Sequence, residues 1–168
     1  PYRGGISKFT STLVEKISNQ HLVKVINFKR QYPKSLFPGS SQYLDSKETL
    51  GERCIDSINP LNWFKVGNKL SKSKFDLIIF NVWHPFFVPA LSIIALQIIK
   101  KSSSTKLVSL CHNILPHEKM IFSKTMICYL LNKMNGHIVL STQSENELLK
   151  LLDRPHYVKQ FHPIYDSF

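Results

Sequence analysis

The chain is short of acidic residues, and that shortage narrows the partners it can have. Its 168 residues contain 11 Asp and Glu against 22 Lys and Arg, which gives a formal net charge of +11 with the histidines neutral. A surface this basic favours an anionic partner such as nucleic acid, lipid headgroups or phosphate-bearing small molecules. The apolar fraction of 43% excludes a disordered tail. The length suits one ordinary domain with a hydrophobic core.

Cysteines and long apolar runs are also scarce. Only Cys54, Cys111 and Cys128 are present, without a C-x-x-C pair, and this excludes a disulfide scaffold and a cysteine-rich zinc module. With no Asn-x-Ser/Thr sequon either, a reducing, cytoplasmic compartment is expected. The most apolar stretch, residues 86–99, contains Pro89. Because a helix needs ~20 apolar residues to span a bilayer, this stretch predicts a buried helix.

Amphipathic helices alternate with short apolar strands along the chain. This pattern predicts an α/β protein with a doubly wound, Rossmann-like parallel sheet. Strands are expected near residues 22–28, 76–82, 106–111, 137–141 and 157–161, and helices near 6–20, 60–71, 85–101, 122–134 and 143–152. Residues 42–58 are expected to be mostly irregular. A glycine loop that opens a first helix normally follows a central first strand, and we expect that strand to be absent because the chain begins at the loop.

Ligands of an open parallel sheet bind beyond the carboxyl ends of its strands, so the residues that follow each strand are the site candidates. Polar, basic and aromatic residues are over-supplied at these positions. Residues Gly4, Gly5, His84, His112, Asn113 and His117 are expected to converge on one cleft. Further candidates for substrate contact are Arg3, Arg30, Trp83, Glu118 and Ser141.

Two of these candidates suggest specific chemistry. Gly4 and Gly5 precede an amphipathic helix and would let backbone N–H groups and the helix N-terminus approach a phosphate. The alternative is a turn that needs a positive φ. His112 ends a buried strand, where a histidine can orient a substrate hydroxyl or stabilise developing charge. The alternative is a core histidine that donates to a backbone carbonyl.

The remaining candidates favour neither a metal nor a resident cofactor. Trp83 and His84 end a strand, where aromatic rings suit stacking on a sugar or lipid, or packing under the next helix. His112, His117 and Glu118 do not have the spacing of H-E-x-x-H, so no metal site is expected. The third glycine of G-x-G-x-x-G is missing, so a nicotinamide site is not expected either.

Seven runs of the chain resemble, in order, the N-terminal domain of retaining glycosyltransferases of family four, which have the GT-B fold. They are PYRGGISKFT, FKRQYPKSLFPG, NPLNWFKVGNKL, FNVWHPFFVPAL, LCHNILPHE, LSTQSENELLKLL and HPIYDSF. The resemblance spans nearly the whole chain. It implies a role in transferring sugars during cell-envelope polysaccharide synthesis.

The resemblance also implies roles for individual residues. Gly4 and Gly5 match the glycine loop beside the donor diphosphate, and His112 matches the histidine that contacts the transferred sugar. Ser141 matches a serine at a strand end. Residues 162–168 would begin an interdomain linker after an acceptor-side domain over 1–161. The nucleotide-sugar donor would bind a C-terminal domain beyond Phe168, so this chain alone is expected to be inactive.

The basic residues also allow a function in binding nucleic acid. A basic Rossmann-like module that binds nucleic acid, or interacts without catalysis, is the alternative function. Nucleic acid is nevertheless not the expected partner, because 18 of the 22 basic residues are Lys, which suits base readout less well than Arg.

The lysines could also serve a membrane. Lysines near apolar residues suit reversible docking on an anionic surface, each contributing ~1 kcal/mol, and this would place the protein on the inner face of the membrane beside a glycan or lipid-linked acceptor. The lysines concerned are Lys65, Lys69, Lys72, Lys74, Lys119 and Lys124. Ordinary solubilising charge is the alternative.

Overall fold

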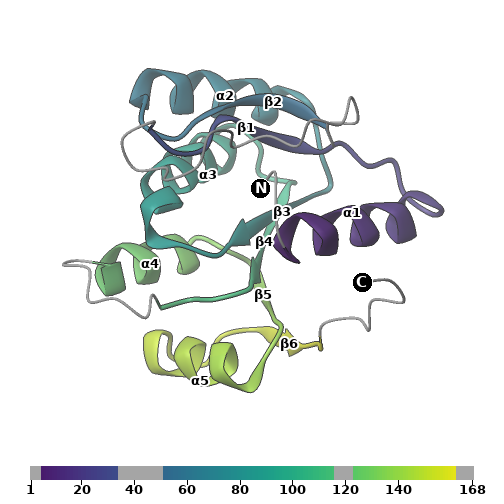
Figure 1. Cartoon of the computed structure of the whole chain (residues 1–168). Helices are drawn as coiled ribbons and strands as arrows, with labels where there is room; N and C mark the ends of the chain where they lie inside the picture. Colours follow the sequence, from purple (N-terminus) through teal and green to yellow (C-terminus); the bar gives the residue numbers. More distant parts are fainter. Residues whose placement is uncertain (1–4, 34–50, 116–122, 162–168) are drawn as a thin grey trace. The chain divides into compact units, whose positions relative to one another are not determined.

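A computed structural model describes residues 5–33, 51–115 and 123–161 (Figure 1). The chain divides into two compact units, Pro1–Asn59 and Pro60–Phe168. We call them the N-terminal unit and the C-terminal unit and describe each by itself. Arg3, Gly4, His117 and Glu118, which are site candidates from the sequence, lie outside the described residues, as does the segment 162–168.

The N-terminal unit contains one helix and a pair of parallel strands. Helix α1 (Gly5–Ser18) carries apolar residues three or four positions apart, and Phe9 is its buried residue. Strand β1 (Ile26–Arg30) pairs in parallel with β2 (Glu52–Asp56). The helix expected over 6–20 is confirmed with small shifts at its ends. The strand expected over 22–28 begins and ends later than predicted.

Strand β2 contradicts the prediction that residues 42–58 are mostly irregular. Three residues of its five-residue sequence, ERCID, are charged, and it lacks an apolar period, so it gave no strand signal. The backbone sets its start: Gly51 has a φ of 81°, and a Cβ there would lie 2.3 Å from the carbonyl oxygen of Val25. Only glycine fits this close approach. The N–H of Glu52 then donates to the same Val25 oxygen at 2.9 Å.

The C-terminal unit alternates helices with four strands. Its elements are α2 (Pro60–Lys72), β3 (Leu77–Val82), η2 (Pro85–Phe87), α3 (Val88–Lys101), β4 (Lys106–Cys111), α4 (Ser123–Leu131), β5 (Gly136–Val139), α5 (Thr142–Leu151) and β6 (Tyr157–Lys159). The strands form one sheet in the order β3-β4-β5-β6, and each pair is parallel. The predicted alternation and the parallel direction of these strands are confirmed. The helix expected over 85–101 is instead a short 3-10 turn followed by α3.

The core of this unit lies around α3 and β4. Ile94, Ala95 and Ile98 of α3 and Leu107 and Leu110 of β4 are at most 1% exposed. Helices α2 and α3 lie side by side (Figure 1). Their contact is close at one point: a Cβ on Gly67 would lie 2.6 Å from the Cβ of Gln97 and 3.1 Å from the carbonyl oxygen of Ile94.

The sheet differs from the sequence expectation in one respect. A single doubly wound sheet was predicted, whereas the described strands pair into a two-stranded sheet in one unit and a four-stranded sheet in the other. β3 is an edge strand of the four-stranded sheet, and Leu77 at its start is 49% exposed. The protein is an α/β protein with parallel sheets, which is compatible with a Rossmann-like architecture.

Candidate functional site

The carboxyl edge of the four-stranded sheet brings several predicted site residues together. The N–H of His112, just after β4, donates to the carbonyl oxygen of Val82 at the end of β3, at 3.0 Å. Asn113 follows and is exposed, and Ser141 follows β5. This edge is the candidate site of the C-terminal unit.

His112 is held in place from two sides. It is 6% exposed, and its Nε2–H donates to Oδ1 of Asn81 in β3, at 3.1 Å. Its carbonyl oxygen accepts a hydrogen bond from the hydroxyl of Ser144 in α5, also at 3.1 Å. The ring of His112 therefore bonds to a side-chain amide. The alternative offered by the sequence, a core histidine, would have donated to a backbone carbonyl. A histidine fixed this way presents its ring in one orientation and one tautomer.

Ser141 has a structural role at the start of α5. Its Oγ accepts a hydrogen bond from the N–H of Ser144 at 3.0 Å, which makes it the N-cap of the helix. Its hydroxyl donates to Oγ of Ser144 at 3.1 Å, and Ser144 in turn donates to the carbonyl oxygen of His112. The cap therefore connects the end of β5 with the end of β4.

The loop after β4 is also attached to α5. The N–H of Leu115 donates to Oε2 of Glu147 at 3.0 Å. Ile114 is 1% exposed, whereas Asn113 beside it is exposed. The loop therefore holds Asn113 at the surface of the candidate site while its neighbours are anchored.

Trp83 and His84 pack locally after β3. Nδ1 of His84 accepts a hydrogen bond from the N–H of Phe86 at 3.2 Å and so caps the 3-10 turn η2. The Trp83 ring lies 4.6 Å from the ring of Phe87, which is 1% exposed. These contacts match the packing interpretation of the aromatic run. The structure thus places both rings next to the site while engaging them in η2.

Arg30 and Gly5, predicted for the same cleft, belong to the N-terminal unit. Arg30 at the end of β1 forms an ion pair with Asp56 at the end of β2. The guanidinium hydrogen bonds hold the pKa of Asp56 below its ordinary value of 3.8, and partial burial opposes them. Gly5 begins α1, and a Cβ there would meet nothing within 4 Å.

A buried polar network beside the site was not predicted from the sequence. Oγ of Ser109 in β4 lies 2.8 Å from Nδ1 of His137 in β5 and 3.3 Å from Sγ of Cys111. Burial lowers the pKa of His137, and it raises the pKa of the Cys111 thiol to about 11. Ser109 and His137 thus connect β4 and β5 inside the sheet.

Residues 5–33, 51–115 and 123–161 contain no group of three His, Cys, Asp or Glu side chains placed to hold a metal. Across the same residues, no helix combines the length and the apolar character needed to cross a membrane.

Comparison of the chain with protein-family models, with curated proteins and with solved structures finds no match. The interpretation of the site therefore depends on its own geometry and on the sequence resemblance.

Proposed function

We propose that the chain is the acceptor-side domain of a retaining, GT-B-fold glycosyltransferase that moves a sugar from a nucleotide-sugar donor to a glycan or lipid-linked acceptor. The observation that carries the proposal is the placement of His112 at the carboxyl end of β4, fixed by Asn81 and Ser144. Ligands of parallel α/β sheets bind at this edge. The donor would bind a second domain that these 168 residues do not include.

In this proposal the transferred sugar binds beside His112, whose ring is oriented by Asn81. Positive charge develops on the sugar ring as the donor bond breaks, and a hydrogen-bonding group held in one orientation stabilises such a state without reorganising. Asn81 positions the ring, and exposed Asn113 offers amide donors and acceptors to the acceptor hydroxyls. No metal ion is required in this mechanism.

The test uses the whole protein encoded by the gene that contains this chain. Purified protein is incubated with a panel of nucleotide-sugars and candidate acceptors, and the anomer of the product is determined by NMR. Transfer with retention is the expected result. His112→Ala should lower kcat by about 100-fold or more, whereas His156→Ala, at an exposed position of the same unit, should leave it unchanged.

Two results would contradict the proposal. Unchanged turnover in His112→Ala would reduce His112 to a packing residue. Absence of transfer from every donor, together with salt-sensitive binding of oligonucleotides, would favour the basic nucleic-acid-binding module instead.

A further inference from the structure

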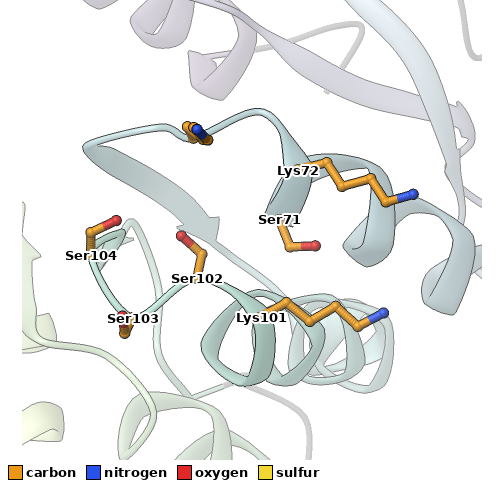
Figure 2. A pocket seen from close by; sticks show the side chains of 7 residues that line it. Ser71, Lys72, Lys101, Ser102, Ser103 and Ser104 are labelled. Atoms are coloured by element: carbon orange, nitrogen blue, oxygen red, sulfur yellow. The ribbon is translucent and has the colours of Figure 1, made fainter.

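A pocket lies at the amino edge of the four-stranded sheet, opposite the candidate site. Its volume is about 630 Å³, and it is lined by the ends of two helices and the turns that lead into β3 and β4. The first set of lining residues is Ser71, Lys72 and Lys74, and the second is Lys101 and Ser102–Ser104. Figure 2 shows Lys72 and Lys101 extending from the two helix ends toward the same side of the view, away from Ser102, Ser103 and Ser104. We call this site the lysine–serine pocket.

The pocket is strongly basic. Three of its seven lining residues are lysines and four are serines, and none is acidic. Helices α2 and α3 end at the pocket, and each helix end carries about half a negative charge. Three ammonium groups therefore outweigh two helix ends by about two charges. Within the described part of the chain, the ion pairs are formed by Lys24, Arg30 and Lys159, and Lys72, Lys74 and Lys101 have no carboxylate partner.

The hydrogen bonds of the pocket divide its residues into two groups. Lys101 Nζ donates to Oδ1 of Asn68 at 2.6 Å, and Ser71 donates to the carbonyl oxygen of Asn68 at 2.9 Å. Ser102 is bonded to Thr105 at 2.7 Å. These contacts build the walls. Lys72, Lys74, Ser103 and Ser104 make no side-chain hydrogen bond within the described residues, so their donors are available to a ligand.

Lys74, one of the lining residues, has an unusual backbone conformation. Its φ is 49°, in the left-handed region that glycine and asparagine occupy with less strain. A lysine here carries a backbone cost that glycine would avoid. The charge of Lys74 lies next to the pocket.

We propose that the lysine–serine pocket binds a phosphate group, independently of the site at the carboxyl edge. Lysine ammonium groups bind phosphate as point charges, and serine hydroxyls add hydrogen-bond donors. The pocket is larger than one phosphate group and lies within the usual range for small-molecule sites, so it has room for the molecule that carries the phosphate. The carrier is either a soluble phosphate ester or an anionic lipid headgroup.

The first experiment measures binding of inorganic phosphate and glycerol 3-phosphate by isothermal titration at constant ionic strength. Saturable binding is expected for the parent chain. The variant Lys72→Gln/Lys74→Gln/Lys101→Gln should bind about tenfold more weakly or worse, because charge-assisted hydrogen bonds are lost. The charge-matched control Lys8→Gln/Lys16→Gln/Lys150→Gln removes three exposed lysines elsewhere and should retain the parent affinity. Equal weakening in both variants, or no saturable binding to any probe, overturns the proposal.

A single substitution separates binding from stability. Lys74→Gly removes the charge and relieves the left-handed backbone, so it should raise the midpoint of thermal unfolding while weakening phosphate binding. Phosphate binding that stays at the parent level in this stabilised variant would exclude Lys74 from the site.

The source of the phosphate is resolved by co-sedimentation with vesicles of phosphatidylcholine, with and without phosphatidic acid. Sedimentation that requires phosphatidic acid and is lost only in the pocket variant assigns the site to a lipid headgroup. Binding of glycerol 3-phosphate without sedimentation assigns it to a soluble ester.

Discussion

Arg30 and Asp56 join the carboxyl ends of the two parallel strands of the N-terminal unit through two hydrogen bonds. Nε of Arg30 donates to Oδ1 of Asp56 at 2.9 Å, and a second guanidinium nitrogen donates to Oδ2. The N–H of Ile58 donates to Oδ1 at 3.2 Å. The sequence predicted Arg30 as a substrate-binding residue, but in the structure its guanidinium holds a buried carboxylate.

Asp56→Asn is expected to remove much of the acid sensitivity of this unit. The folded pKa of Asp56 lies below 3.8, so its stabilising contribution is present above that pH and is lost as the pH falls through the lower folded value. The variant should be less stable than the parent near neutral pH, and the difference should shrink in acid. Urea unfolding at a series of pH values measures this. The exposed Asp153→Asn is the control, and an unchanged pH response in Asp56→Asn would contradict the assignment.

Ser141→Ala should lower the free energy of unfolding by about 1 kcal/mol, because it removes the N-cap of α5. Ser141→Asp retains an acceptor for the N–H of Ser144 and should stay close to the parent. Chemical denaturation of the three proteins tests the cap. Equal stability of the alanine variant and the parent would show that the cap contributes little.

Gly67→Ala should destabilise the C-terminal unit even though alanine favours helices. Helix propensity gains about 1 kcal/mol, but overpacking against Gln97 costs about 1–3 kcal/mol, so a net loss is expected. Gly136→Ala is the matched control, because its Cβ would lie at an ordinary 3.6 Å from the carbonyl oxygen of His156. Thermal unfolding should rank Gly67→Ala lowest. A stabilised Gly67→Ala would show that α2 and α3 separate easily.

His137 is expected to make stability fall as the pH drops below about 6.5. Burial lowers its folded pKa, so between that value and the ordinary 6.5 the unfolded chain binds more protons than the folded one. The free energy of unfolding should therefore decrease from pH 7 to pH 5. The decrease should be smaller in His137→Gln. Equal slopes in the two proteins would assign the effect to other histidines.

Cys111 should resist alkylation in the folded protein. The reactive species is the thiolate, and burial raises the pKa of this thiol to about 11. Iodoacetamide at pH 8 should label half-buried Cys128 ahead of Cys111, and urea should remove the difference. Peptide mass spectrometry measures both sites. Rapid labelling of native Cys111 would indicate that β4 opens.

Hydrophobic pattern made part of the fold predictable. The runs that became β3 and β4 are almost continuously apolar, and tertiary burial reinforces their local preference. β2 was missed because its partner β1 is distant in sequence: the two strands pair in parallel, and the ion pairs Lys24–Glu52 and Arg30–Asp56 lie at their ends. In a doubly wound sheet the strand before the first helix pairs on both sides. The described residues include no strand before α1, and the described strands form two sheets.

The position of the candidate site was predictable, but its hydrogen bonds were not. Strand ends follow from the sequence, so His112, Asn113 and Ser141 were correctly expected at one edge. Asn81 lies 31 residues before His112, and Ser144 lies 32 residues after it. A polar residue inside an apolar strand was the only signal for Asn81. Their spacing along the chain could not indicate that Asn81 contacts the ring of His112 and Ser144 its carbonyl oxygen.

The close contact between Gly67 and Gln97 also affects how much conformational entropy is lost when an anion binds in the lysine–serine pocket. Lys72 and Lys101 extend from the ends of the two helices that this contact presses together. Their backbones are thus spaced before a ligand arrives, and binding needs to order only side chains, at about 0.5–1.5 kcal/mol for each one immobilised. A receptor with fixed spacing discriminates by the size of its anion. We therefore expect this pocket to discriminate between anions more by their size than by their total charge.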